Sequence, residues 1–225
     1  MTIGFRVLQR RRKVAADIVA KFRNLPVANV SDVMSRMSAG GARLRPLHAG
    51  GPMAGPALTV KTRPGDNLMI HKALLMAEPG DVIVVDAGGD LTIALVGELM
   101  LSYAIARGVA GIVINGAVRD YGWIKSNGFP VFAAGVTHRG PFKDGPGEIN
   151  VPVALDGMVI EPGDLVLGDD DGLLCVPFDQ AATIHEQAHA KNEAEAKILA
   201  NTQAGRLDPK TWVDESLKRL GCEGV

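Results

Sequence analysis

Two short apolar runs, Val82–Val85 and Val109–Ile114, constrain the fold most strongly. Neither run alternates apolar with polar residues, so each predicts a strand that is covered on both faces, as in a parallel sheet. Between them, residues 98–107 predict a helix with a broad apolar surface, and Gly108 suits the left-handed cap that ends it. A strand, a helix and a second strand in this order predict an α/β fold with a parallel sheet.

Charged residues stand at the two ends of this helix–strand unit. Gly97 and Glu98 open the helix, and Arg119 and Asp120 follow the second strand after a predicted Asn115–Gly116 turn. A helix and a returning parallel strand bring the chain back to the level at which the helix began. Both ends should therefore share the carboxyl edge of the sheet, where open α/β sheets bind ligands.

The rest of the chain predicts further helices and a second β-rich layer. A repeated Glu-Pro-Gly-Asp sequence, at 78–81 and 161–164, predicts two strands entered through the same turn chemistry. Further helices are expected at 14–24, 31–37, 67–77, 179–204 and 211–220, and further strands at 57–60, 130–134, 151–155, 158–160, 165–167 and 173–176. The long helix has a thin apolar stripe, typical of packing on a neighbouring subunit. We therefore divide the chain into an α/β catalytic domain with short N-terminal helices, residues 1–177, and a C-terminal helical extension, residues 178–225, that packs on a neighbouring subunit.

Composition excludes several classes of protein. A net charge of −1 over 225 residues argues against a nucleic-acid partner, and the basic run Arg10–Lys13 is expected to be a solvated N-terminal arm. No apolar run approaches the roughly 18 residues of a membrane span. Two cysteines are too few for a disulfide framework, which fits a reducing cytoplasm.

Asp120 and Arg119 are the first candidates for chemistry. A carboxylate completed by waters and substrate oxygens suits Mg²⁺ or Mn²⁺, whereas the competing interpretation is an Arg-Asp pair that caps a helix on the surface. The planar guanidinium of Arg119 matches a carboxylate or an enolate oxygen. Backbone N–H groups around Gly97, Leu99 and Met100, at the helix start, would bind a substrate carboxylate.

Glu98 lies in the same first turn and allows three interpretations. It could orient Arg119, act through a water as an acid or base, or simply be an acid that favours the helix dipole. The spacing does not choose between them.

These residues together resemble a known family. Gly97-Glu98-Leu99-Met100, followed by Arg119-Asp120 with twenty residues between Glu98 and Arg119, resembles the signature of the family that contains the regulator of ribonuclease E activity and the class II 4-hydroxy-4-methyl-2-oxoglutarate aldolases. The runs Val85–Asp90, Gly116–Asp120 and Gly128–Phe132 are also similar, and the resemblance covers residues 31–177. It implies a single domain of the swivelling β/β/α type, in homotrimers or homohexamers with sites between subunits.

The resemblance also implies a role for each site residue. In the aldolase branch, Gly97, Glu98, Leu99 and Met100 would hold pyruvate, Arg119 would contact the substrate, and Asp120 would bind the metal. A C-terminal helix lends a glutamate to the neighbouring site, and here either Glu193 or Glu195 could do so. Two departures stand out, because Glu98 replaces the more familiar Asp and Trp123 replaces an expected acidic residue.

The expected function is that of a divalent-metal-dependent aldolase. It would cleave 2-oxo acids of the 4-hydroxy-4-methyl-2-oxoglutarate type to pyruvate through a metal-bound enolate, and would also decarboxylate oxaloacetate. The alternative is a non-catalytic regulator that binds ribonuclease E or a similar protein partner. A menaquinone methyltransferase is not favoured, because no convincing nucleotide-binding glycine motif lies between a first strand and helix.

Overall fold

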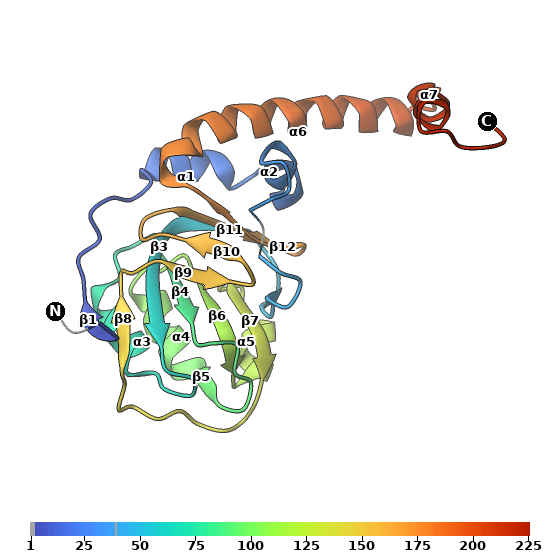
Figure 1. The fold of residues 1–225 in the computed structure, drawn as a ribbon. Helices are drawn as coiled ribbons and strands as arrows, with labels where there is room; N and C mark the ends of the chain where they lie inside the picture. Colours follow the sequence, from blue (N-terminus) through green and yellow to red (C-terminus); the bar gives the residue numbers. More distant parts are fainter. Residues whose placement is uncertain (1–2, 39) are drawn as a thin grey trace. The chain divides into compact units, whose positions relative to one another are not determined.

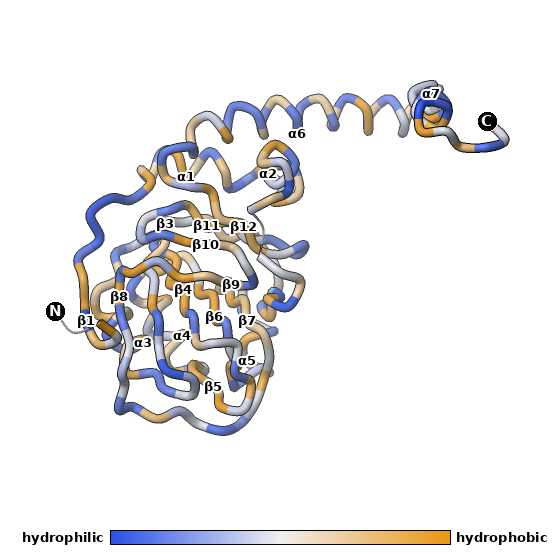
Figure 2. The backbone as a smooth tube through the Cα atoms, viewed as in Figure 1, coloured by the Kyte–Doolittle hydropathy of each residue, from blue (hydrophilic) through white to orange (hydrophobic). Residues whose placement is uncertain are grey.

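The centre of the fold is a parallel sheet, described here from a computed structural model that covers residues 3–38 and 40–225. Four parallel neighbours form its middle: β3 (Met53–Thr62), β4 (Val82–Asp86), β6 (Gly111–Val118) and β7 (Val131–Val136). With β1 (Phe5–Val7), β8 (Gly147–Ile149) and β2 (Arg45–Pro46), the main path of the sheet runs β1-β8-β3-β4-β6-β7-β2. Figure 2 shows hydrophobic residues concentrated in these central strands, as expected for strands buried on both faces.

Three helices cover one face of the sheet (Figure 1). They are the crossover connections α3 (Leu68–Met76), α4 (Glu98–Ala106) and α5 (Tyr121–Ser126). Ile83 and Val85 of β4 pack against them together with Ile112 and Ile114 of β6. Because successive residues of a strand point to opposite faces, Val82, Val84 and Val113 face the other way.

A second β layer covers the other face. It contains the antiparallel hairpin of β9 (Val153–Leu155) and β10 (Met158–Ile160), with β11 (Leu165–Asp169) and β12 (Gly172–Val176). Residues of the hairpin and of β12 share one buried cluster with Val82, Val84 and Val113. The predicted α/β fold with β/β/α layers is therefore confirmed.

A third cluster joins the N-terminal helices to β11 and β12. The helices α1 (Ala16–Phe22) and α2 (Val27–Val33) pack there with the first turns of α6 (Ala181–Gln203), which bury Ile184 and Ala188. The remaining elements are β5 (Ala94–Val96), a 3-10 turn at Phe178–Gln180, and α7 (Trp212–Arg219).

The chain separates into two compact units. The first ends at His189, and the second spans Ala190–Val225 and contains the rest of α6 and all of α7. Several large apolar side chains of the second unit are exposed, namely Ile198, Leu199, Leu207, Trp212 and Leu220. Within the described residues, no helix has the length and apolar content needed to cross a membrane.

Two local predictions were wrong. The second short helix begins at Val27, directly after Pro26, and not at Ser31, because proline is favoured immediately before or at the first helical position. The pair Asn115–Gly116 does not form a turn but continues β6 to Val118, since β5 and the end of β7 supply strand partners there.

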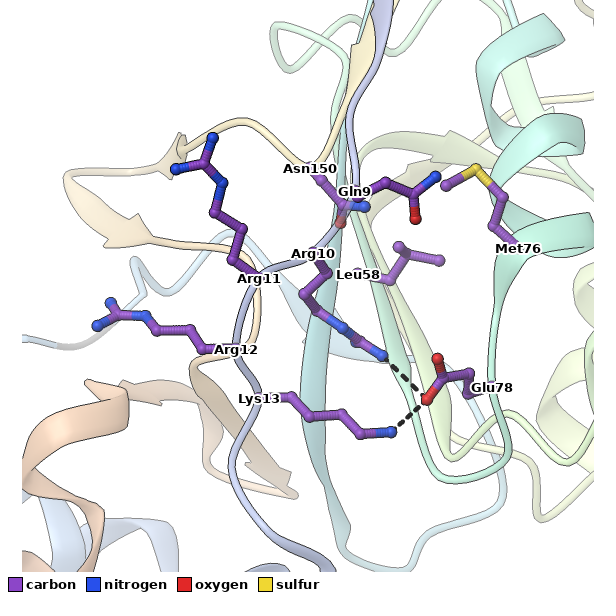
Figure 3. A pocket seen from close by; sticks show the side chains of 9 residues that line it. All are labelled: Gln9, Arg10, Arg11, Arg12, Lys13, Leu58, Met76, Glu78 and Asn150. Atoms are coloured by element: carbon purple, nitrogen blue, oxygen red, sulfur yellow. Dashed lines mark hydrogen bonds and ion pairs between the residues drawn. The ribbon is translucent and has the colours of Figure 1, made fainter.

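The basic run near the N-terminus is not a solvated arm, which corrects a third prediction. Arg10 donates to both carboxylate oxygens of Asp81 at 2.8 and 3.1 Å, and the two side chains are only 9% and 1% exposed. Lys13 and Arg10 both pair with Glu78, as Figure 3 shows. These residues line a pocket of about 300 Å³. In Figure 3 the Arg11 side chain points away from Glu78 and Met76.

Residues 8–14, here called the N-terminal strap, connect the two Glu-Pro-Gly-Asp turns. In each turn the aspartate accepts the backbone N–H of the glutamate at 2.9 Å, and the glycine takes a φ near +90°. Arg10 binds the aspartate of the first turn, and Arg12 pairs with Glu161 of the second at 2.7 Å. The strap therefore holds two equivalent turns that lie far apart in the sequence.

Candidate functional site

The structure brings together the two charged ends of the helix–strand unit. Short strand β5 ends at Val96 and pairs with the end of β6, so Gly97 at the start of α4 lies beside Arg119. The Arg119 N–H donates to the Val96 carbonyl at 2.9 Å, which fixes this alignment. Gly97, Glu98, Arg119 and Asp120 thus share one edge of the sheet.

Asp120 connects two helices at this edge. Its Oδ2 accepts the backbone N–H of Glu98 at 2.9 Å and lies 3.8 Å from Nε of Arg119. Its backbone has a φ of +59°, a left-handed conformation that is uncommon outside glycine, and its carbonyl accepts the N–H groups of Trp123 and Ile124 in α5. The carboxylate remains 40% exposed, so it stays open to a ligand.

Gly97 leaves room for that carboxylate. A Cβ atom at this position would lie 2.3 Å from Oδ2 of Asp120 and 2.8 Å from Cγ of Arg119. The backbone of Gly97 is extended, with a φ of −152°, so its conformation would allow any residue. The close approach of Asp120 therefore explains the glycine.

A pocket of about 170 Å³ opens beside these residues. Its walls come from α3, from the β5–α4 junction and from the loop that precedes β8. Its lining residues are Asn67, His71, Ala94, Leu95, Val96, Gly97, Leu99, Met100, Arg119, Pro141 and Lys143. The sequence predicted Gly97, Leu99, Met100 and Arg119, whereas Asn67, His71 and Lys143 were missed. Asn67 and His71 stand one helical turn apart on a predicted helix, a spacing that could have marked a shared face.

Asn67 belongs to the wall of this pocket and has one buried side-chain oxygen without a partner in the described chain. The residue is only 2% exposed, and its Nδ2 donates to the Leu95 carbonyl at 2.9 Å. Its Oδ1 has no partner among the residues that the structure describes.

Asp66 fixes the loop that carries Lys143. Its buried carboxylate accepts the backbone N–H groups of Leu68, Asp144 and Gly145 at 2.8–2.9 Å. Burial alone would raise the pKa of Asp66, but these three hydrogen bonds and the charge of Arg63 lower it below its ordinary value. Asp66 therefore remains ionised and continues to hold the loop.

His71 contributes a neutral imidazole to the pocket. Partial burial lowers its pKa below 6.5, and the positive charge of Lys143 lowers it further. At neutral pH the ring is a hydrogen-bonding group without charge. The positive charges of the pocket are then those of Arg119 and Lys143.

The first turn of α4 offers fewer backbone donors than the sequence predicted. The Glu98 N–H binds Asp120, and the Met100 N–H donates to the Gly97 carbonyl at 3.1 Å. The Leu99 N–H has no acceptor within the helix, as is usual in a first turn. Leu99 N–H is therefore the backbone donor best placed for a bound anion.

The other predicted site residues lie at the edge of this arrangement or in the second unit. The Glu98 side chain is exposed, and within the described part of the chain it forms no ion pair with Arg119. Trp123 is partly buried against the core and so does not take the place of an acidic ligand. Glu193 and Glu195 lie on the part of α6 in the second unit, where Glu195 pairs with Lys191 at 2.7 Å.

The fit to a divalent cation depends on Asp120. Across residues 3–38 and 40–225, no three His, Cys, Asp or Glu side chains cluster as a protein-only metal cage. Mg²⁺ often binds through one or two carboxylates and fills its other positions with water and substrate. An exposed Asp120 whose Oδ1 forms no bond to a described residue fits that mode.

The fold and the site define a β/β/α protein in which two basic residues line a pocket and the exposed carboxylate of Asp120 lies beside one of them. The chain belongs to the RraA-like family, since the model described as Aldolase/RraA matches residues 27–175. A relative from Halalkalibacterium halodurans is 40% identical over 188 residues, which cover 82% of this chain and 90% of that one. It carries the provisional name 4-hydroxy-4-methyl-2-oxoglutarate aldolase.

Two solved structures share the fold. An uncharacterised protein from Pseudomonas syringae pv. tomato superposes with a TM-score of 0.79 at 26% identity, covering 88% of this chain and 93% of that one. The RNA-processing inhibitor RraA from Thermus thermophilus gives a TM-score of 0.63 at 32% identity, covering 68% and 92%. The family therefore includes proteins named as an enzyme and as an inhibitor of RNA processing.

Proposed function

We propose that this protein is a divalent-metal-dependent aldolase that cleaves 2-oxo acids of the 4-hydroxy-4-methyl-2-oxoglutarate type and releases pyruvate. The protein would also decarboxylate oxaloacetate, because both reactions break the bond between C3 and C4 of a 2-oxo acid. The observation that carries the proposal is the contact of Asp120 with Arg119 and with the first turn of α4, which together line one side of the pocket. The name of the relative from Halalkalibacterium halodurans supports the same class of reaction.

The protein residues have separable tasks in this reaction. The Leu99 N–H binds the carboxylate of the substrate, and Arg119 stabilises negative charge on the 2-oxo group. Asp120 would hold Mg²⁺ or Mn²⁺, which when bound supplies Lewis-acid withdrawal of electrons from that group. In aldol cleavage the C4 hydroxyl loses its proton, the C3–C4 electron pair moves to the pyruvate fragment, and C3 is then protonated.

Glu98 is the proposed acid–base group. Its side chain is exposed at the start of α4, its backbone N–H binds the carboxylate of Asp120, and it makes no ion pair with Arg119 in the described chain. A water beside Glu98 can therefore carry the proton from the C4 hydroxyl and return one to C3. The longer side chain of glutamate suits action through a water.

A second copy of the chain completes the site in this proposal. Leu99 is 83% exposed at the pocket, and Tyr103 on the same helix is also exposed, which is unusual for large apolar residues that border a binding site. We propose that a neighbouring subunit, in a homotrimer or homohexamer, covers them. The extension 178–225 would pack on that neighbour and place Glu193 or Glu195 at its site. Two free cysteines are compatible with a cytoplasmic location.

Pyruvate release is the direct test. The full chain with Mg²⁺ or Mn²⁺ is expected to form pyruvate from 4-hydroxy-4-methyl-2-oxoglutarate and from oxaloacetate, measured by coupling to lactate dehydrogenase. Chelation with EDTA should stop both reactions, and added metal should restore them. If neither substrate yields pyruvate above the metal-only background, the aldolase proposal is wrong.

The alternative function is regulation of RNA processing, which the likeness to the Thermus inhibitor favours. In that case the protein would bind ribonuclease E or a similar partner and slow RNA cleavage without chemistry at Asp120. An Asp120→Ala variant separates the two functions, since it should lose pyruvate release but keep any inhibition of the ribonuclease. Inhibition by both forms, without pyruvate release by the unmodified protein, would favour the regulator.

A further inference from the structure

Lys143 is held at the pocket by its backbone and not by a side-chain partner. On one side of it, Phe142 exchanges backbone hydrogen bonds with Gly65 and Asn67 at 2.9 and 3.0 Å. On the other side, the N–H groups of Asp144 and Gly145 bind the buried carboxylate of Asp66. The loop is therefore fixed immediately before and after Lys143.

The ammonium group of Lys143 is unneutralised. It lines the pocket, yet within the described residues it forms no ion pair and no hydrogen bond. Arg119, from the other end of the sheet edge, also lines the pocket and already lies close to Asp120. Of the two positively charged residues that line the pocket, Lys143 is thus the one without an acidic partner among the described residues.

An unpaired cation on a fixed loop suits a second anionic group of the ligand. The neutral His71 contributes no competing positive charge at neutral pH, and Lys143 lines the same pocket. A ligand with one carboxylate needs only the end of the pocket formed by α4 and Arg119. A ligand with two carboxylates would use both ends.

We infer that Lys143 binds the second carboxylate of a 2-oxo diacid whose first carboxylate and 2-oxo group lie against α4 and Arg119. This inference rests on the proposed function for the orientation of the substrate, and it assigns the specificity for diacids to one residue. Lys143 takes no part in bond cleavage. It is a binding residue for the half of the substrate that leaves after the C3–C4 bond breaks.

The test compares two acids of equal chain length by calorimetry with the full chain and Mg²⁺. The first, 2-oxoglutarate, is a diacid without the 4-hydroxyl group that aldol cleavage requires, and the second, 2-oxopentanoate, has a methyl group in place of the second carboxylate. The unmodified protein is expected to bind the diacid up to about fivefold more tightly, as one exposed charge pair allows. Lys143→Met should remove that preference and leave 2-oxopentanoate binding unchanged, whereas Lys143→Arg should keep it.

Lys72→Met is the matched control, since it removes the same charge from a residue next to His71 that does not line the pocket. The control should keep the preference for the diacid, and thermal unfolding should show that all variants fold. The inference is overturned if Lys143→Met keeps the preference, if both acids lose affinity equally, or if neither acid binds.

The same experiment separates this inference from the aldolase proposal, because it measures binding without turnover. Binding of the diacid that depends on Lys143, without pyruvate release from any substrate, would refute the aldolase and keep the role of Lys143. Pyruvate release, together with diacid binding that does not depend on Lys143, would support the aldolase and refute the role of Lys143.

Discussion

The carboxylate of Asp120 accepts the backbone N–H of Glu98 at 2.9 Å, although the two residues stand 22 positions apart. One oxygen of the proposed metal ligand therefore caps the helix that offers backbone donors to the substrate. Of the two interpretations that the sequence allowed for Asp120, a helix cap and a metal ligand, the structure shows the first and leaves Oδ1 open for the second. A change at either residue should consequently affect both metal binding and the substrate pocket.

Gly97→Ala should lower pyruvate release much more than Gly122→Ala does. The added methyl group would lie 2.3 Å from Oδ2 of Asp120, so the carboxylate must move away from the Glu98 N–H. Pyruvate release is expected to fall by about 100-fold or more, because small displacements of a reacting group are costly. Gly122→Ala is the control, since a Cβ there meets no atom within 4 Å. Equal loss of activity in both variants would contradict this account of Gly97.

Asp120→Asn should weaken metal binding while preserving the helix cap. An asparagine oxygen can still accept the Glu98 N–H, but the amide lacks the charge that holds a divalent cation. Pyruvate release should fall by at least about 100-fold, since even residues that only support a metal ligand can cost 10- to 100-fold. Titration with Mn²⁺, followed by electron paramagnetic resonance, measures the loss of affinity. Unchanged Mn²⁺ affinity would place the metal elsewhere.

Arg10→Met should destabilise the protein far more than Arg11→Met. Arg10 and Asp81 are both buried, so removal of the arginine leaves a buried carboxylate without its partner, at a cost of about 3–5 kcal/mol. Arg11 is exposed and its replacement should change the free energy of unfolding by less than about 0.5 kcal/mol. Urea unfolding curves compare the two. Similar midpoints would show that the strap contributes little to stability.

The pH dependence of stability should contain a contribution from His71. Its pKa in the folded protein lies below the unfolded value of 6.5, so unfolding is accompanied by proton uptake as the pH falls below 6.5. The stability that His71 contributes is therefore present above pH 6.5 and decreases as the pH falls toward the folded pKa. In urea unfolding at pH 7.5 and 5.5, His71→Gln should lose less stability on acidification than the unmodified protein.

Lys143→Met supplies a second check on the same group. Removing the positive charge brings the pKa of His71 closer to 6.5, so this variant should also show a smaller loss of stability between pH 7.5 and 5.5. If His71→Gln and the unmodified protein lose equal stability between pH 7.5 and 5.5, the pKa of His71 is not lowered in the folded protein.

Short sequence patterns predicted the two central strands and the helix between them. The apolar runs of β4 and β6 and the helix between them follow from hydrophobicity and from the glycine at 108, whose φ is +72°. The pairing of β1 with β8 could not be predicted, because Phe5 and Gly147 are brought together only by the completed sheet. The extension of β6 through Asn115 likewise depends on strands that come from elsewhere in the chain.

The candidate site likewise combines residues that local sequence places together with residues that only the completed fold brings near. Gly97 and Arg119 follow from one helix and one strand, and their proximity is a property of that unit. Lys143 reaches the pocket through the hydrogen bonds of Asp66 to a distant loop, an arrangement that no local pattern encodes. The role of Glu193 or Glu195 depends on a second subunit and remains a prediction.

The N-terminal strap also bears on the order in which the molecule is completed. During synthesis Arg10 and Arg12 leave the ribosome early, but their partners Asp81 and Glu161 follow 71 and 149 positions later. The strap can therefore close over the second turn only when most of the first unit has been made. The strap is translated before its partners but is among the last segments to dock, so its protection from proteases should report completion of the fold.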